Sequence, residues 1–153
     1  MEQDMPYWEK TPNAIARKYF KDNNLTYDDV TKARWRMLIA ILEKHLEQRN
    51  KEQEEIEKQD KWKKDYTYEL DKCVYNKKTK QKPFITAYIN VKVDNYSVRE
   101  GISFNSDGWI GFAGWASTYN TIPFTNAFIE WVDWLVKEKN NEQNAGETIS
   151  TNI

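Results

Sequence analysis

Ile85, Ala87, Ile89, Val91 and Val93 alternate with Thr86, Tyr88, Asn90 and Lys92, a pattern typical of a β-strand with one buried face. Two turn sequences, DN and NSDG, separate this stretch from two further apolar stretches, the last of which ends at Trp115. We therefore expect a β-meander over residues 84–115. Glu100 falls on the otherwise apolar face of the middle stretch, which predicts a β-bulge near Glu100-Gly101.

Two helices are predicted before the meander. Thr11-Pro12 supplies an N-cap and a first helical residue, and this helix should run to about Lys21. Its core-facing residues are expected to be Ile15, Tyr19 and Phe20. A second start signal lies at Thr26, where Asp29 completes an approximate capping box. The apolar stripe of the second helix follows helical spacing: Val30, Ala33, Met37, Leu38, Ile41, Leu42, His45 and Leu46.

Residues 47–65 contain helix-forming residues and few apolar ones, so we expect the second helix to continue as a solvated rod or a partner-binding arm. The aromatic residues at 66–75 then suggest a first strand. Pro123 and Thr125 begin a last helix, with one apolar face that should cover the sheet: Phe124, Phe128, Trp131, Val132 and Leu135.

These elements predict an α+β fold: two N-terminal helices, the second long, an antiparallel meander of about four strands, and a C-terminal helix packed on the sheet. We expect one domain over residues 1–138, with its helical part at 11–65 and its sheet and last helix at 66–138. The polar residues 139–153 are expected to form a disordered tail.

The amino-acid composition excludes only a few classes of function. The net charge is −1, which gives no global field for nucleic acid or membrane. The single cysteine, Cys73, excludes an intramolecular disulfide framework and favours a reducing, cytoplasmic compartment. No apolar run approaches the length needed to span a bilayer, so no membrane partner is expected.

Catalytic motifs are absent from the sequence. It lacks a nucleophile elbow, a Walker A loop, a GxGxxG fingerprint and HExxH, and we expect no catalytic residue, cofactor or metal site. His45, the only histidine, lies on an apolar helical stripe and is interpreted as a packing residue. We therefore expect a protein that is not an enzyme.

The aromatic residues give the first functional hypothesis. Tryptophan and tyrosine dominate the energetic hot spots of protein interfaces, and the chain has seven tryptophans and nine tyrosines. A surface formed by Trp109, Trp115 and Trp134, with Trp62 on the charged arm, could bind a partner protein. A homodimer is the other protein–protein association that the sequence leaves open.

The lysines of one segment give the alternative functional hypothesis, which is nucleic-acid binding. Residues 61–82 carry eight lysines and three acids, interleaved with aromatic residues, which is a composition that can bind phosphates and stack bases. A lysine-rich hairpin at the edge of a sheet, which only keeps the protein soluble, would have the same composition. The candidate nucleic-acid-binding residues are Lys61, Lys63, Lys64, Lys77, Lys78, Lys80 and Lys82.

The chain's small size, its Lys-, Asn- and Tyr-rich usage, its long charged helix and its lack of catalytic motifs resemble accessory proteins of bacteriophages and mobile elements. In general form, over residues 11–138, the chain is similar to anti-CRISPR proteins, with no diagnostic motif that would transfer site residues. This resemblance implies a phage-type, non-enzymatic inhibitor that binds a host effector in the host cytoplasm. A charge of −1 departs from the strongly acidic DNA mimics of that group, so contact with protein surface is expected.

Overall fold

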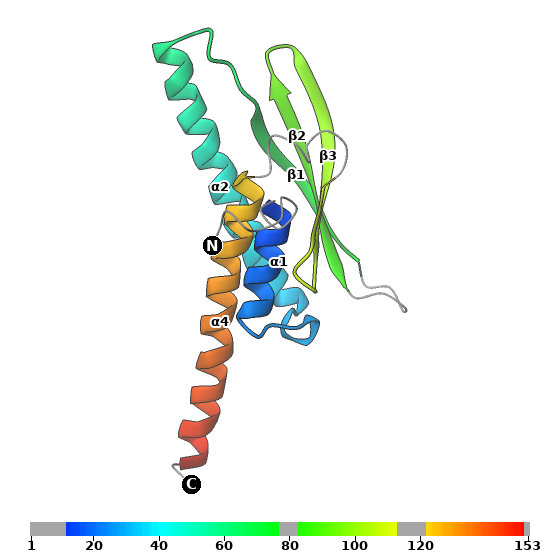
Figure 1. Cartoon of the computed structure of the whole chain (residues 1–153), viewed down its shortest axis with the longest axis vertical. Helices are drawn as coiled ribbons and strands as arrows, with labels where there is room; N and C mark the ends of the chain where they lie inside the picture. Colours follow the sequence, from blue (N-terminus) through cyan, green and yellow to red (C-terminus); the bar gives the residue numbers. More distant parts are fainter. Residues whose placement is uncertain (1–11, 77–82, 113–121, 152–153) are drawn as a thin grey trace, which may run out of the picture.

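The computed structural model describes residues 12–76, 83–112 and 122–151, and it confirms the predicted α+β class (Figure 1). No helix in these ranges is both long enough and apolar enough to cross a membrane. The elements follow the chain in this order: α1 (Pro12–Asp22), the 3₁₀ turn η3 (Tyr27–Asp29), α2 (Lys32–Gln59), β1 (Thr67–Asn76), β2 (Phe84–Val93), β3 (Tyr96–Asn105), β4 (Ile110–Phe112) and α4 (Ile122–Thr151).

The four strands form one antiparallel sheet in the order β1-β2-β3-β4, so β1 lies at one edge. The pairing of β2 with β3 is continuous through Glu100 and Gly101, and the bulge predicted there is wrong. The register shift lies instead in β1, between Leu70 and Lys72. Glu100 keeps its place in the alternation and is buried on the core-facing side, with 8% of its surface exposed.

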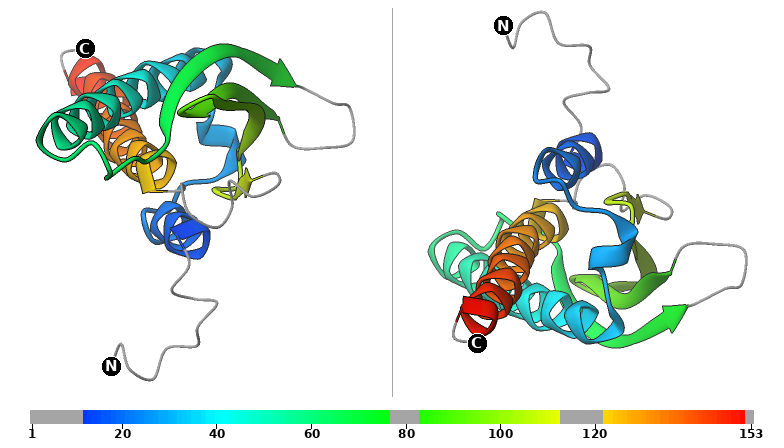
Figure 2. Two further views of the ribbon diagram at one scale, coloured as in Figure 1. Left: turned by 90° about the horizontal axis from the view of Figure 1, so that it is seen from above. Right: turned by 90° about the horizontal axis from the view of Figure 1, so that it is seen from below.

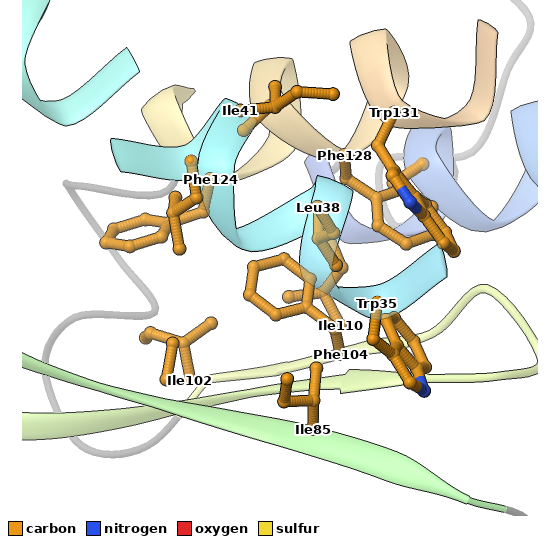
Figure 3. Packing of buried hydrophobic residues seen from close by; sticks show 14 of the residues in the cluster. Trp35, Leu38, Ile41, Ile85, Ile102, Phe104, Ile110, Phe124, Phe128 and Trp131 are labelled. Atoms are coloured by element: carbon orange, nitrogen blue, oxygen red, sulfur yellow. The ribbon is translucent and has the colours of Figure 1, made fainter. Parts of the chain in front are cut away.

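Helices α2 and α4 pack against each other and against one face of the sheet (Figure 2). The core between these layers combines aliphatic residues with several stacked aromatic rings (Figure 3). Trp35 of α2 stacks on Trp131 of α4 with ring centroids 5.1 Å apart, and Phe128 of α4 stacks on Phe104 of β3 at 6.1 Å. The predicted apolar face of the last helix is therefore confirmed, and it covers the sheet as expected.

The first two helices differ in detail from the prediction. In α1 the buried residues are Ala16 and Phe20, whereas Ile15 is 45% exposed. Helix α2 begins at Lys32, because Thr31 is its N-cap and accepts a 3.2 Å hydrogen bond from the amide of Arg34. Thr26 starts only the 3₁₀ turn, where its amide donates to the side chain of Asp29.

The two long helices end elsewhere than the sequence predicted. Helix α2 stops at Gln59 rather than near residue 65, because the Asp60 side chain accepts the Trp62 amide at 3.0 Å and competes with helical bonding. Helix α4 continues to Thr151, whereas the sequence pattern predicted a disordered tail from residue 139. Two ion pairs support the continuation, Lys139–Asp29 at 3.2 Å and Arg34–Glu142 at 2.8 Å.

Candidate partner-binding surface

Three of the four tryptophans predicted to bind a partner are among the described residues, and these three lie on separate parts of the fold. Trp62 is in the linker between α2 and β1 and is 82% exposed. Trp109 follows the turn after β3, where the guanidinium of Arg17 lies 5.2 Å from the ring centroid. Trp134 is half-buried on α4, and Trp115 lies outside the described residues. Trp109 and Trp134 thus have different neighbours, and Trp62 is the most exposed of the three.

Trp134 lines an open groove of about 800 Å³ between the start of α2 and the middle of α4. Both ion pairs that support the extension of α4 involve residues of this groove, so much of its charge is already neutralised within the chain. The part of the chain that the structure describes contains no cluster of histidine, cysteine and carboxylate side chains fit to hold a metal ion.

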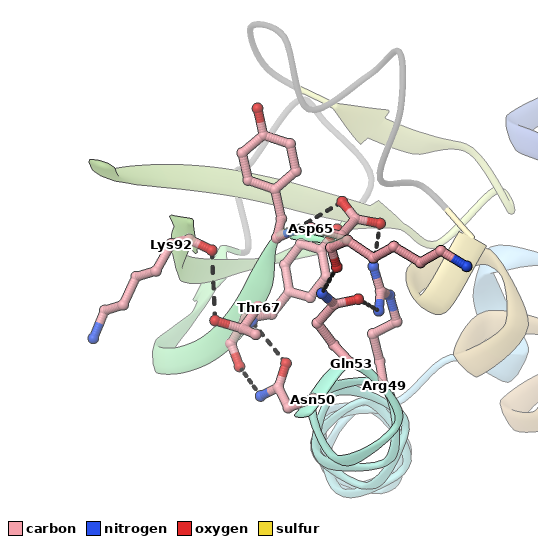
Figure 4. Close-up of polar contacts among 9 residues, drawn as sticks. Arg49, Asn50, Gln53, Asp65, Thr67 and Lys92 are labelled. Carbon is pink, nitrogen blue, oxygen red and sulfur yellow. Dashed lines mark hydrogen bonds and ion pairs between the residues drawn. The ribbon is translucent and has the colours of Figure 1, made fainter. Parts of the chain in front are cut away.

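The linker that carries Trp62 is fixed by side chains of α2 (Figure 4). Gln53 is 2% exposed, and its amide nitrogen donates to the carbonyl of Lys63 at 2.8 Å. Arg49 pairs with Asp65 at 2.7 Å and also donates to the oxygen of Gln53 at 3.5 Å. The linker is thus tied to α2 on the C-terminal side of the tryptophan.

A local turn fixes the N-terminal side of the same linker. The Asp60 side chain accepts the amide of Trp62, and the Asp60 carbonyl accepts the amide of Lys63 at 3.1 Å. Together with the contacts of Gln53 and Arg49, these bonds hold the backbone on both sides of the exposed indole. Trp62 is therefore presented from an ordered segment.

Asn50 continues this network onto the edge of the sheet. Its side-chain oxygen accepts the amide of Tyr68 at 2.9 Å, and its nitrogen donates to the carbonyl of Tyr68 at 2.7 Å. The side chain thus occupies both backbone groups that an added strand would use at this position. Sequence reasoning missed Asn50 and Gln53; their spacing of three, which places them on one helical face, was the available signal.

We define the tip surface as Ile56, Lys61, Trp62 and Tyr96, which belong to the C-terminal part of α2, the linker and the start of β3, at the same end of the molecule (Figure 1). Ile56 is 42% exposed and Tyr96 is 53% exposed, and the ammonium of Lys61 lies 5.2 Å from the centroid of the Trp62 ring. An ion pair between Lys64 and Asp94 connects the linker to the β2–β3 turn, and its hydrogen bond raises the pKa of Lys64. The tip surface thus combines exposed apolar side chains with the ammonium group of Lys61.

The structure describes only part of the predicted nucleic-acid-binding set. Lys61, Lys63 and Lys64 precede β1, and Lys64 is neutralised by Asp94. The other four, which follow the end of β1 in the chain, lie outside the described residues: Lys77, Lys78, Lys80 and Lys82. Since β1 has ten residues, its two ends are about 30 Å apart.

Two side chains with nucleophilic or general-base chemistry were interpreted from the sequence as structural. Burial raises the pKa of the Cys73 thiol to about 11, with a smaller contribution from Glu43, so this thiol is protonated at neutral pH. The ring of His45 is half-buried, and its Nε2 lies 3.4 Å from a carboxylate oxygen of Glu130. Both side chains lie among packed residues of the fold.

No protein-family model, curated protein sequence or solved structure matches this chain. The functional argument therefore starts from the surfaces described above.

Proposed function

We propose that this protein acts by binding another protein, and that the tip surface with Trp62 at its centre is the binding site. The observation that carries the proposal is an indole that is 82% exposed on a linker fixed from both sides. Leaving so large an apolar side chain in water costs about 1.5–3 kcal/mol relative to burying it. A partner that covers Trp62 would recover this free energy.

Preorganisation favours Trp62 over the other exposed apolar residues. Binding normally costs about 0.5–1.5 kcal/mol for each flexible side chain or segment that becomes ordered. The bonds made by Gln53, Arg49 and Asp60 have already ordered the linker in the free protein. Tryptophan is also enriched at interface hot spots, where it is surrounded by residues that exclude water.

The resemblance to anti-CRISPR proteins refines the proposal. It supports a phage-type inhibitor and makes a host nucleic-acid-processing effector the first kind of partner to test. The net charge of −1 supports recognition of a protein surface over imitation of a DNA duplex.

Nucleic-acid binding through the lysine-rich segment remains the second candidate, supported by a local excess of five positive charges over residues 61–82. Acidic neighbours weaken it among the described residues, since Lys64 pairs with Asp94 and Lys92 pairs with Glu69. If nucleic acid is the ligand, its affinity should fall steeply as salt concentration rises.

The test is capture of host proteins from a nuclease-treated bacterial lysate by the full chain and by three variants. We expect Trp62→Ala to lower the affinity for the captured protein at least about tenfold, in line with loss of a hot-spot residue. Gln53→Ala, which frees the linker while keeping the indole, should have a smaller effect in the same direction. Ile15→Ala, at an exposed apolar position on α1, is the matched control and should bind normally.

Two outcomes would count against the proposal. Equal capture by the parent chain and Trp62→Ala, with circular dichroism showing that both proteins are folded, would exclude the tip surface as the binding site. Capture that disappears on nuclease treatment would instead support the nucleic-acid candidate.

A further inference from the structure

A groove runs between the N-terminal half of α2 and the C-terminal half of β1, away from the tip surface. One part has a volume of about 270 Å³ and is lined by Lys32, Trp35, Arg36, Ile39, Cys73, Tyr75 and Ile85. A wider part of about 610 Å³ continues towards η3 and shares Lys32 and Tyr75 with the first. The two parts therefore form one continuous depression along the edge of the sheet.

The backbone beside this groove is the free edge of an edge strand. Because β1 pairs only with β2 among the described residues, every second residue of β1 directs its amide and carbonyl away from the sheet. Asn50 occupies these groups at Tyr68, near the start of the strand. Over residues 72–76, the hydrogen bond between a described side chain and the β1 backbone is that of the Asn76 side-chain amide, which donates to the Val74 carbonyl at 3.3 Å. This half of the edge can accept another strand.

The walls of the groove are apolar and contain one unused donor. Ile39 and Cys73 are half-buried, and Ile85 is buried behind them. Trp35 is 1% exposed, and its buried indole nitrogen has no hydrogen-bond partner among the described residues. An incoming segment could place a small apolar side chain against this wall.

The border of the groove on α2 is basic. Lys32 and Arg36 are exposed, and no carboxylate of the described residues forms an ion pair with either of them. The ammonium of Lys32 lies 5.6 Å from the centroid of the Tyr75 ring, above the middle of the groove. The nearest acids, Asp28 in the wider part and Glu43 near Cys73, lie towards the two ends.

We propose that an extended, acidic segment of a partner protein binds here as a fifth strand, paired with the backbone of residues 72–76 of β1. Its carboxylates pair with Lys32 and Arg36, and its alternate apolar side chains fill the groove. This mode of recognition takes affinity from backbone hydrogen bonds and specificity from the side chains beside them.

A second copy of the chain fits the same edge poorly. Antiparallel pairing of two β1 strands would place Lys72 of each copy in the interface. Residues 72–76 contain no carboxylate that could pair with Lys32 or Arg36 of the other copy. Like charges placed opposite each other across an interface disfavour the association. The charge pattern therefore selects an acidic partner segment over self-association.

The test uses a random-peptide phage library selected on the immobilised full chain, followed by affinity measurements with the enriched synthetic peptides. We expect the enriched peptides to be richer in Asp and Glu than the unselected library. The double variant Lys32→Glu/Arg36→Glu should weaken their binding at least about tenfold. The matched control, Lys51→Glu/Lys58→Glu, makes the same charge change on an exposed part of α2 outside the groove and should leave binding unchanged.

Two further measurements make the binding mode specific. N-methylation of alternate peptide amides should abolish binding in one register and preserve it in the other, because only one set of amides faces β1. Hydrogen exchange should slow at residues 72–76 in the complex. Trp62→Ala should bind the peptides normally, so this inference and the proposed function fail independently.

Three results would overturn the proposal: no enrichment of acidic peptides, binding that survives the double charge reversal, or no protection of residues 72–76. A dimer in sedimentation equilibrium that dissociates on Tyr75→Pro, which removes an outward-facing amide of β1, would also overturn it, since the edge would then serve a second copy.

Discussion

Trp131 joins α4 to α2 through a single side chain. Its ring is buried against Trp35, and its Nε1 donates to the carbonyl of Arg34 at 2.9 Å. Trp131→Phe keeps most of the stacking but removes this donor, and should lower the free energy of unfolding by about 1–3 kcal/mol. Trp131→Ala should cost about 3–5 kcal/mol through the cavity it leaves. Urea denaturation measures both, and Trp134→Phe, at a half-buried position on the same helix, should change stability by less than about 0.5 kcal/mol.

Cys73 allows a test of its environment by simple thiol chemistry. Since the thiolate is the reactive form, a pKa of about 11 instead of the ordinary 9.0 should slow alkylation at pH 8 about a hundredfold. The same chain unfolded in urea is the control, and the rate of iodoacetamide labelling is the measurement. The folded state should also lose stability as the pH rises from 9 towards 11, because only the unfolded chain then releases this proton. Labelling at equal rates in both states would show that the thiol is exposed.

At the residue level, the sequence predicted the C-terminal helix well and the second helix less well. The face containing Phe124, Phe128 and Trp131 was identified because Pro123 marks the helix start and fixes the phase of the pattern. For α2 the phase was taken from Val30, which is extended and precedes the helix. That choice placed Met37 on the buried face and missed Trp35, the largest buried side chain of α2.

At the level of elements, Asn50 is the contact that connects α2 to the start of β1. Asn50→Ala would leave the amide and carbonyl of Tyr68 without their partner and should lower the free energy of unfolding by about 1–3 kcal/mol. It would also lengthen the free edge of the sheet, so we expect more concentration-dependent association. Gln48→Ala, which removes only an exposed bond to Glu52, is the control. Unfolding in urea and light scattering provide the two readouts.

The strands were predictable because alternation and turn residues are local signals, and β2, β3 and the intervening turn lie where the pattern placed them. The conformation of the linker at 60–66 was not predictable from the sequence. It depends on Gln53 and Arg49, whose hydrogen-bond partners follow ten and sixteen residues later in the chain. A sequence rich in helix formers gives no sign that Gln53 bonds to a backbone carbonyl outside the helix and Arg49 to a carboxylate outside it. The candidate site was therefore only partly predictable. The sequence identified Trp62 as a candidate binding residue, but only tertiary contacts explain why its backbone is fixed.

For the whole molecule, the question is how much the extension of α4 contributes to the fold. Residues beyond 138 contact η3 through the pair Lys139–Asp29 and the start of α2 through the pair Arg34–Glu142, in which Asp29 and Arg34 are largely buried.

Each pair should contribute at most about 1 kcal/mol, because the partner on α4 is more exposed. A chain that ends at residue 138 should therefore fold with the same circular dichroism per ordered residue, and its free energy of unfolding should be about 1–2 kcal/mol lower. The difference should shrink in high salt, where surface ion pairs are screened. The full-length double variant Lys139→Ala/Glu142→Ala separates the two pairs from the rest of the extension. If that variant is as stable as the parent chain while the truncated chain is unfolded, packing of the extension rather than the ion pairs stabilises the molecule, and the domain extends past residue 138.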